Sequence, residues 1–346
     1  MKQGLIKIGR IESFSKELEQ LANNKKTFIL CDSNTKQCIN YFKSKIPFFS
    51  TSFVIEIEPG EKNKTLESAN SIWEELIDKK ANRADLLINI GGGLITDLGG
   101  FVASTFKRGI SFINIPTSLL GMIDASIGGK TGVNCLNFKN QIGTFYLPEI
   151  TICDPEFLAT LGDQELLSGY AEAIKHGLVY DEKYWEFCTA KSLKKIDLTT
   201  VISKSIELKS KIVEIDPFEK NERKLLNFGH TIGHALEAIN LSKTPILHGF
   251  AVANGMRIEA FIAKKLSLLS PADYTTIDKV ISDYFPIISY EDQDIKPLIA
   301  QMLNDKKNSS SKINFTLINK IGNGIFDQHI ETTLIEQILL DFNKEN

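Results

Sequence analysis

The residues best suited to chemistry are histidines gathered in one stretch of the chain. Of five histidines, three, His230, His234 and His248, fall within nineteen residues. The first two are spaced i, i+4 and therefore share one face of a predicted helix. Together with Glu172 they could supply the three His or carboxylate ligands that a catalytic zinc ion usually takes. These residue types predict a divalent metal site, and spacing alone leaves open which histidines bind the ion.

A glycine-rich turn at 91–93 directly follows the apolar run 86–90. Glycines let the backbone pass close to a ligand, and a helix starting there would direct free N–H groups at a phosphate. The spacing is not that of the common dinucleotide fingerprint, so a tight turn without a ligand is an equal alternative. A second polar turn, with Asp32 and Asn34, also follows an apolar run. Two such turns favour a nucleotide site at the carboxyl ends of parallel strands.

The segment 116–132 combines glycines and small hydroxyl residues with Asp124 and Lys130, and the pair Lys139-Asn140 begins nine residues beyond Lys130. This set suits a phosphorylated or polyhydroxylated ligand, because Lys offers a point charge while Asn both donates and accepts hydrogen bonds. On composition alone, a solvated glycine-rich loop has equal weight.

The elements that must position these residues change character along the chain. In the first half, β-rich runs alternate with helical patterns such as 66–79, where Trp73, Leu76 and Ile77 form one stripe, and this alternation predicts a parallel sheet covered by helices. From about Asp154 the pattern is mainly helical, with one strand-like run at 313–318 and a polar loop at 305–312. The expected strands are 27–31, 53–57, 86–90 and 111–115, and the expected later helices are 163–179, 199–215, 224–240 and 250–266.

Two details follow from these patterns. Pro155 fixes a turn before a new helix, so we place the domain boundary between residues 153 and 154. Within the helix expected at 224–240, Arg223 and Asn227 would continue the face of His230.

Length and composition exclude several classes of protein. The 346 residues carry a net charge of -3 and are 42% hydrophobic and 24% charged, which is typical of a globular protein of about two domains. The near-neutral charge argues against nucleic-acid or membrane-surface binding. The five cysteines form no C-x-x-C pair, the first ten residues lack the apolar region typical of a signal peptide, and no run of eighteen apolar residues occurs. We therefore expect a cytoplasmic protein with no nucleic-acid or membrane partner.

Taken in order, the polar segments resemble the 3-dehydroquinate synthase family over about residues 27–322, and an ordered set is far more specific than any single motif. The matching segments are the Gly-Gly-Gly-x-x-x-Asp turn ending at Asp97, Arg108-Gly109, Pro116-Thr117-Ser118, Asp124-x-Ser-x-Gly-Gly-Lys130-Thr131-Gly132, Lys139-Asn140, Gly-x-Ala-Glu172-x-Ile-Lys175, Arg223-x-x-x-Asn227-Phe-Gly-His230-Thr-Ile-Gly-His234, His248-Gly249 and Asp305-Lys306-Lys307.

The resemblance implies an α/β N-terminal nucleotide-binding domain with a parallel sheet (1–153) and a mainly α-helical C-terminal metal-binding domain (154–346). It implies a phosphate-eliminating carbon–oxygen lyase of the shikimate pathway, which converts the sugar phosphate 3-deoxy-D-arabino-heptulosonate 7-phosphate to 3-dehydroquinate. In that reaction NAD transiently oxidises the C5 hydroxyl, phosphate leaves, the hydride returns and an aldol reaction closes the ring. The implied cofactors are NAD and one divalent ion, zinc or cobalt.

The resemblance also implies roles for individual residues. Its metal ligands carry over onto Glu172, His230 and His248. NAD would be bound by Asp32, Asn34, Glu61, Lys64, Gly92, Gly93, Asp97, Thr117, Ser118, Leu120, Lys130, Lys139 and Thr160. The substrate carboxylate would be held by Lys209, Arg223 and Asn227, and the ring hydroxyls would lie near Asp124 and Lys175. The leaving phosphate would be surrounded by Lys130, Asn140, His234, Lys307 and, from the neighbouring subunit of an expected homodimer, Arg108.

Two segments depart from the family pattern. Residues 161–165 lack the usual Leu-Pro-x-Arg-Glu, and residues 216–222 lack the usual Asp-Glu-x-Glu-x-Gly. Which of Lys306 and Lys307 would contact phosphate is open.

Three alternatives explain less of the sequence. Related cyclases that make valiolone or inosose share the NAD and metal motifs, but their substrates have no carboxylate for Lys209, Arg223 and Asn227 to hold. Metal-dependent polyol dehydrogenases fit the segment 124–130 poorly. A nonenzymatic NAD-binding protein is expected to have lost a metal ligand or the phosphate lysine, and this sequence has lost none of them.

Overall fold

The computed structural model describes residues 4–136, 138–240, 245–303 and 311–345. By its internal contacts the chain divides into two compact units. Unit 1 comprises Met1–Leu166 and Leu198–Ser210, and unit 2 comprises Leu167–Asp197 and Lys211–Asn346. The domain boundary between residues 153 and 154 stays a prediction.

Unit 1 is built on a six-stranded sheet in which every neighbouring pair is parallel. The strand order is β1-β8-β5-β4-β2-β3. The strands are β1 (Leu5–Ile8), β2 (Thr27–Asp32), β3 (Phe53–Ile57), β4 (Leu86–Gly91), β5 (Ser111–Pro116) and β8 (Ile150–Cys153). The four expected strands are confirmed. The two unpredicted ones, β1 and β8, have only four residues each, too few for a recognisable period.

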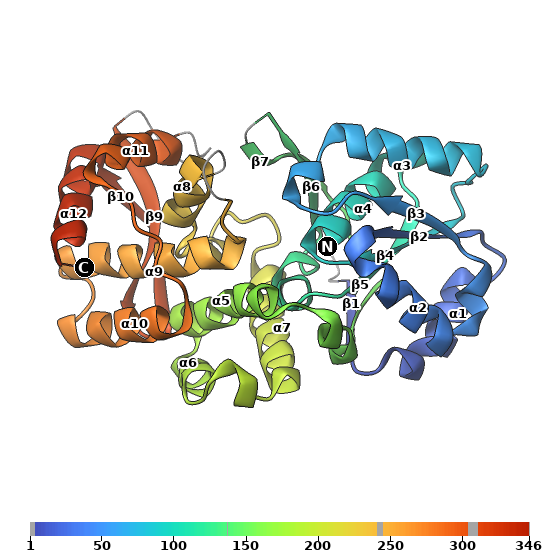
Figure 1. Cartoon of the computed structure of the whole chain (residues 1–346), viewed down its shortest axis with the longest axis horizontal. Helices are drawn as coiled ribbons and strands as arrows, with labels where there is room; N and C mark the ends of the chain where they lie inside the picture. Colours follow the sequence, from blue (N-terminus) through green and yellow to red (C-terminus); the bar gives the residue numbers. More distant parts are fainter. Residues whose placement is uncertain (1–3, 137, 241–244, 304–310, 346) are drawn as a thin grey trace. The chain divides into compact units, whose positions relative to one another are not determined.

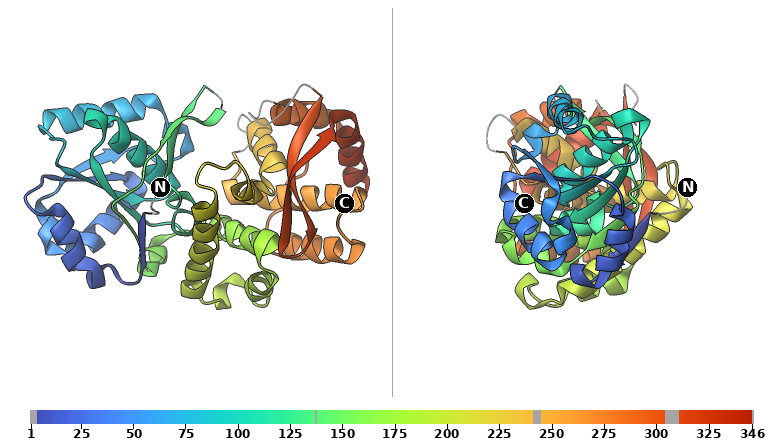
Figure 2. Two further views of the ribbon diagram at one scale, coloured as in Figure 1. Left: turned by 180° about the vertical axis from the view of Figure 1, so that it is seen from behind. Right: turned by 90° about the vertical axis from the view of Figure 1, so that its right-hand side faces the viewer.

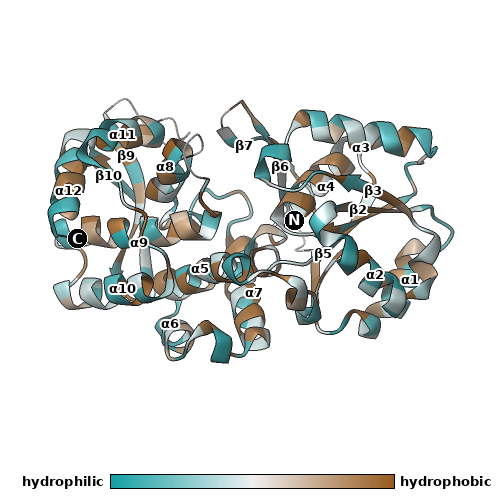
Figure 3. Cartoon of the chain, viewed as in Figure 1, coloured by the Kyte–Doolittle hydropathy of each residue, from teal (hydrophilic) through white to brown (hydrophobic). Residues whose placement is uncertain are grey.

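Helices cover both faces of this sheet. The pair α1 (Ser15–Ala22) and α2 (Lys36–Lys45) lies on the opposite side from α3 (Leu66–Asp78) and α4 (Gly93–Thr105), as Figures 1 and 2 show. Apolar residues concentrate on the strands and on α4 (Figure 3). Burial of this apolar surface is the main force that holds the layers together.

The apolar stripe of α3 differs in part from the expected one. Leu76 is fully buried and Trp73 packs against the core, but Ile77 is 62% exposed. The buried positions are Ala69, Ile72 and Leu76, which follow the steps of three and four that one helix face requires. Including Ile77 in the stripe was therefore wrong.

The glycine-rich segment after β5 forms regular structure. It contains a π-helical turn (Gly121–Ala125) and then β6 (Lys130–Cys135), which pairs antiparallel with β7 (Phe138–Phe145). Helix α4 packs closely on β6, since a Cβ on Gly100 would lie 2.4 Å from Cγ2 of Thr131. The interpretation of this segment as only a solvated loop is wrong.

Unit 2 is mainly helical, as expected. Its longest buried element is α9, in which every residue from 249 to 263 is buried. Helix α5 begins in unit 1 and continues in unit 2, whereas most of α7, residues 198–210, belongs to unit 1 and only its last turn belongs to unit 2. The helices are α5 (Asp163–Tyr180), α6 (Glu182–Thr189), α7 (Leu198–Ile215), α8 (His230–Asn240), α9 (His248–Lys265), α10 (Pro271–Tyr284), α11 (Ile295–Leu303) and α12 (Thr332–Glu345).

Two antiparallel strands accompany these helices. The expected strand at 313–318 is the centre of β9 (Lys312–Lys320), and its partner is β10 (Asn323–Glu331), which the sequence did not reveal. Figure 2 shows the pair beside α12. Strand β10 has no clean alternation because its register shifts twice and Asp327 has a φ of 58°.

The single helix expected at 224–240 is broken. Residues Glu222–Asn227 form a 3₁₀ segment, and α8 begins only at His230. The break lies at Gly229, whose φ is 80° and whose Cβ, if present, would lie 2.5 Å from Met256 Cγ. The prediction that Arg223 and Asn227 continue the helical face of His230 is therefore wrong.

Two findings concern the chain as a whole. All five cysteines are free thiols. No helix in the described part of the chain combines the length and apolar character needed to cross a membrane.

Candidate active-site groups

The metal site predicted from residue types has a matching cluster in unit 2. Glu172, His230 and His248 come from α5, α8 and α9, and their ligand atoms lie within 4.8 Å of one another. Both imidazole Nε2 atoms face one carboxylate oxygen, Glu172 Oε1, at 3.7 Å from His230 and 3.9 Å from His248. Ligands about 2.0–2.1 Å from a tetrahedral zinc ion are about 3.4 Å apart. A small contraction of this cluster would therefore suit such an ion.

Hydrogen-bond partners orient both imidazoles. His230 Nδ1 lies 3.2 Å from the carbonyl oxygen of Phe228, and His248 Nδ1 lies 3.3 Å from Glu237 Oε2. Because a carbonyl and a carboxylate accept hydrogen bonds, each Nδ1 is the protonated nitrogen and each Nε2 keeps its lone pair. The sequence alone did not reveal Glu237 as a partner, although an outer carboxylate is the usual companion of a metal-binding histidine.

The charge state of the cluster also suits a metal ion. Burial lowers the pKa of His230 well below its ordinary value, and the nearby Lys175, His234 and His248 lower it further. The imidazole is thus neutral, the form that binds metals. The carboxylate of Glu172 is fully buried, and among the described residues its Oε1 atom accepts no hydrogen bond. Its close neighbour is the Lys175 ammonium, with which it forms an ion pair.

A second combination of possible ligands overlaps the first. His234, Glu237 and His248 also bring their ligand atoms within 4.8 Å of one another. His234 is exposed, whereas His230 belongs to the cluster around the buried Glu172. The geometry and burial favour the set with Glu172, which leaves His234 for another role.

In unit 1, the expected nucleotide-binding turns lie side by side. They follow β2, β4 and β5, which are neighbours in the sheet, so the turns occupy one edge. A Cβ on Gly92 would lie 3.2 Å from Ser118 Oγ, and the Thr117 amide donates to the Gly91 carbonyl at 3.0 Å. Because the order of strands reverses between β2 and β4, this edge is a topological switch point, where α/β sheets bind ligands.

The turn after β2 also positions residues around it. Asp32 is buried, and its carboxylate accepts from the amide and hydroxyl of Thr35. Thr160 lies close to the helix that follows, with its hydroxyl 3.6 Å from Cys38 Sγ. Asn34 is exposed.

A buried lysine joins three segments of unit 1. The Lys64 ammonium donates to Asp97 Oδ2 at 2.5 Å and to Asn140 Oδ1 at 2.7 Å. Burial lowers the pKa of Lys64, but attraction to Asp97 and Glu61 more than offsets this and raises the pKa above its ordinary value. The lysine is therefore charged, and it holds the 61–64 turn against α4 and β7.

Asn134 completes this network and was missed in the sequence. Its side chain accepts from the Asn140 amide at 2.9 Å and donates to Glu61 Oε1 at 2.9 Å. Its own amide donates to the Lys64 carbonyl at 2.7 Å. An isolated Asn in a strand carries no motif, so only the fold could place it here.

The residues expected to hold the substrate carboxylate divide between the units. In unit 1, Lys209 on α7 donates to Asp124. In unit 2, Arg223 is buried, and its guanidinium donates to the Pro217 carbonyl at 2.7 Å. The Asn227 amide donates to Glu219 Oε1 at 2.6 Å.

The departing segment 216–222 is organised by Asp216. Its carboxylate accepts from the backbone amides of Lys220, Asn221 and Arg223 at 2.9, 2.6 and 3.2 Å. Burial raises the pKa of Asp216, but these hydrogen bonds and the Arg223 charge outweigh it and leave the pKa below its ordinary value. A different sequence thus still forms a closed turn next to Arg223.

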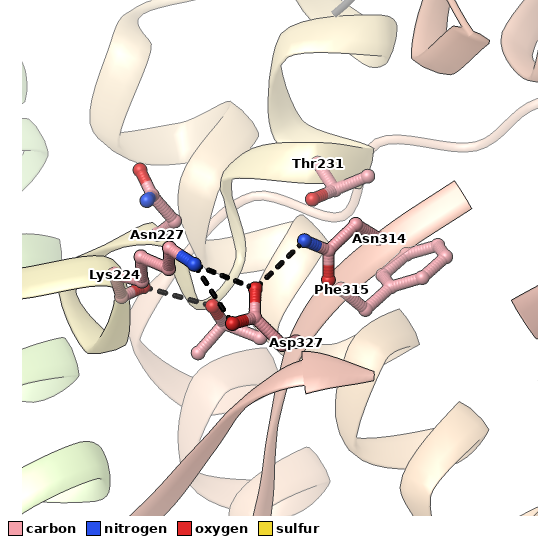
Figure 4. A pocket seen from close by; sticks show the side chains of 7 residues that line it. Lys224, Asn227, Thr231, Asn314, Phe315 and Asp327 are labelled. Carbon is pink, nitrogen blue, oxygen red and sulfur yellow. Dashed lines mark hydrogen bonds and ion pairs between the residues drawn. The ribbon is translucent and has the colours of Figure 1, made fainter. Parts of the chain in front are cut away.

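A small pocket lies behind Asn227 (Figure 4), lined by Lys224, Asn227, Thr231, Asn314, Phe315, Thr316 and Asp327. Lys224 Nζ donates to Asp327 at 2.7 and 2.9 Å, and Thr316 donates to the Lys224 carbonyl at 2.8 Å. The Asn314 side-chain amide donates to Asp327 Oδ1 at 2.9 Å. The side-chain amide of Asn227 points away from the ion pair of Lys224 and Asp327 (Figure 4). The β9–β10 pair therefore anchors the 3₁₀ segment that carries Arg223 and Asn227.

The remaining expected site residues differ in their exposure. Lys130 and Arg108 are exposed, Leu120 and Lys139 are half-buried, and Lys307 falls outside the described residues. The expected ligands of NAD, together with Asp124 and Lys209, belong to unit 1, whereas the metal cluster, Lys175, Arg223, Asn227 and His234 belong to unit 2.

Comparison with known proteins identifies the family. The profile of the 3-dehydroquinate synthase N-terminal domain matches residues 54–168, and that of its C-terminal domain matches residues 169–308. A 3-dehydroquinate synthase of Parabacteroides distasonis is 41% identical over 327 residues, which is 93% of this chain and 92% of that protein.

Solved structures share the fold at lower identity. A 2-epi-5-epi-valiolone synthase from Streptomyces hygroscopicus, solved with NAD+ and Zn2+, has a TM-score of 0.86 and 23% identity, and covers 99% of this chain and 97% of its own. A 2-deoxy-scyllo-inosose synthase was solved with carbaglucose-6-phosphate, NAD+ and Co2+. It has a TM-score of 0.85 and 23% identity, and the match covers 98% of this chain and 99% of that chain. The two matching profiles and the 41% identity together establish that this chain belongs to the 3-dehydroquinate synthase family.

Proposed function

We propose that the protein is a 3-dehydroquinate synthase, which converts 3-deoxy-D-arabino-heptulosonate 7-phosphate to 3-dehydroquinate and phosphate. The observation that carries this proposal is the cluster of Glu172, His230 and His248 in a chain 41% identical to a named synthase over most of its length. The fold alone would not suffice, because related cyclases share it at 23% identity.

The metal ion would be bound by Glu172, His230 and His248. A fully buried carboxylate beside two imidazoles, of which His230 has a pKa well below its ordinary value, is a suitable donor set for zinc or cobalt, and it leaves a position open for substrate. When bound, the metal ion would polarise two substrate hydroxyls, and NAD would supply the transient oxidation of one of them. The Lys175 ammonium, paired with Glu172, would offer a proton donor beside those hydroxyls.

NAD would be bound in unit 1, at the edge formed by the turns after β2, β4 and β5. The amide groups at the start of α4 suit the pyrophosphate, and Asp32 suits a ribose hydroxyl. The Lys64, Asp97 and Asn140 network would hold neighbouring backbone in place. These contacts support the proposal of a polar binding edge in unit 1.

The substrate would be recognised by its two anionic groups. Arg223, Lys209 and Asn227 would bind the carboxylate, with Arg as a planar fork and Lys as a point charge. Lys130, Asn140, His234 and Lys307 would surround the phosphate. We also propose a cytoplasmic homodimer in which Arg108 of one copy reaches the site of its neighbour.

The competing function is that of a cyclase making a valiolone or inosose product. Such enzymes need no carboxylate site, so the presence of Arg223, Lys209 and Asn227 favours the synthase. Phosphate release should be measured side by side with heptulosonate 7-phosphate and sedoheptulose 7-phosphate. Turnover of only the first supports the proposal, and turnover of only the second would assign the chain to the valiolone-forming group.

A further inference from the structure

Helices α8 and α9 are joined by a carboxylate at each end of their contact. At one end, Glu237 on α8 lies 3.3 Å from His248 on α9. At the other end, Glu259 on α9 accepts from the backbone amides of Gly229 at 2.6 Å and Ile232 at 3.0 Å. Each helix thus supplies one carboxylate to its partner, and the two amides bound by Glu259 flank His230 in sequence.

The backbones of this pair approach closely between the two carboxylates. A Cβ on Gly255 would lie 2.0 Å from the Gly229 carbonyl oxygen, and a Cβ on Gly233 would lie 3.0 Å from the Ala251 carbonyl oxygen. No side chain separates the helices here, so there is little room for one to slide on the other. The first turn of α8 is therefore registered against α9 by Glu259.

Glu259 is suited to this role by its burial and charge. Its side chain is fully buried, and both of its carboxylate oxygens accept from amides at a helix N-terminus, where a negative charge is stabilised. Removing one oxygen acceptor would leave a buried N–H unpaired. Helix α9 thereby carries His248 directly and fixes His230 through Glu259.

We infer that Glu259 is a positioning residue that sets the affinity of the metal centre by holding the first turn of α8, and with it His230, in the ligating position. This inference rests on the proposed metal site. Groups outside the ligand shell commonly change metal affinity by about 10–100-fold when they are altered. We expect a loss of about tenfold or more in cobalt affinity when one Glu259 acceptor is removed.

The test compares Glu259→Gln with the full-length parent protein. Dissociation constants for Co2+ are measured by competition with a chelator, and the unfolding temperature is measured on the metal-free protein. The matched control is Asp154→Asn, because Asp154 is also fully buried and accepts from two backbone amides, those of Ile11 at 2.8 Å and Glu156 at 3.0 Å. Both variants should lose stability, and only Glu259→Gln should lose cobalt affinity.

Equal cobalt affinity of Glu259→Gln and the parent would show a purely structural role and overturn the inference. A parent that binds no Co2+ or Zn2+ would instead overturn the proposed metal site. If Glu259→Gln does not fold, amide hydrogen exchange in the metal-free parent decides. Slow exchange of the Gly229 and Ile232 amides before metal is added is the expected result, and protection that appears only with metal would contradict it.

Discussion

The Lys209 ammonium lies 2.5 Å from Oδ1 of Asp124 and 2.6 Å from its backbone oxygen, across 85 residues of sequence. The lysine side chain is only 7% exposed, so this contact is largely shielded from water. It ties the portion of α7 that belongs to unit 1 to the π-helical turn. Two residues expected to contact substrate are thus positioned by each other.

Replacing Lys209 with Met should weaken both folding and catalysis. The Asp124 carboxylate would lose a charged donor, and a hydrogen bond to a charged group contributes about 1.5–3 kcal/mol. Urea denaturation should show that the free energy of unfolding falls by this amount, and steady-state kinetics should show a lower kcat/KM. The control is Lys204→Met on the same helix, where an exposed pair with Glu207 at 3.7 Å predicts a change within about 0.5 kcal/mol. Equal effects of both variants would contradict the role of the Asp124 contact.

Replacing Glu172 with Gln should abolish metal retention while nearly preserving side-chain volume. The neutral amide is a weak ligand for a divalent ion, so metal content after gel filtration should fall from one equivalent to near zero. The matched variant is Glu237→Gln, which should retain part of its metal because Glu237 orients His248 through Nδ1. The contrary result is full metal content in Glu172→Gln and no bound metal in Glu237→Gln. It would assign the metal site to His234, Glu237 and His248.

The Asp216 turn predicts a specific dependence of stability on pH. Because the folded pKa is below the unfolded value of about 3.9, the ionised carboxylate stabilises the protein above pH 4, and this contribution is lost as the pH falls through the folded pKa. The difference in free energy of unfolding between parent and Asp216→Asn should therefore be full at pH 7 and narrow below about pH 4. Urea denaturation at several pH values measures it. If the difference in free energy of unfolding between the two proteins stays constant or widens below pH 4, the stabilising role of the ionised Asp216 carboxylate is refuted.

The ion pair of Lys224 and Asp327 predicts an effect on substrate binding. Asp327→Asn loosens the segment that carries Arg223 and Asn227, so KM should rise by about twofold to fivefold, equivalent to less than about 1 kcal/mol, with little change in kcat. The control is Glu331→Gln on the same strand, which breaks an exposed pair with Lys312 at 3.1 Å. A KM that is unchanged in Asp327→Asn, or raised equally in both variants, would contradict the anchoring role.

Much of unit 1 could be predicted from the sequence because its central strands are continuous apolar runs bounded by turns. The positions of Asp32, Gly92 and Thr117 at one edge follow once such strands are taken as parallel neighbours. The network around Lys64 could not be predicted in this way. Asn134 joins it through backbone as well as side-chain groups, and such contacts leave no periodic signal.

In unit 2 the residue types indicated a metal site, but not its arrangement. The i, i+4 spacing does not show whether His230 or His234 binds the metal ion. The burial of Glu172 and the orientation of the Nε2 atoms toward its carboxylate favour His230. The break before α8 depends on the close approach of Gly229 to α9, a tertiary constraint that local propensity does not contain. Strand β10 was missed for a similar reason, because its pairing with β9 overrides an irregular pattern.

The most direct measurement is a phosphate-release assay on the purified protein with NAD, a divalent metal ion and 3-deoxy-D-arabino-heptulosonate 7-phosphate. The expected result is one phosphate and one 3-dehydroquinate per substrate consumed, with no net accumulation of NADH, because the hydride that is removed is returned. Activity should disappear on chelation and return with Zn2+ or Co2+. Stoichiometric NADH without phosphate release, or no turnover by a metal-loaded protein that turns over sedoheptulose 7-phosphate, would contradict the proposed function.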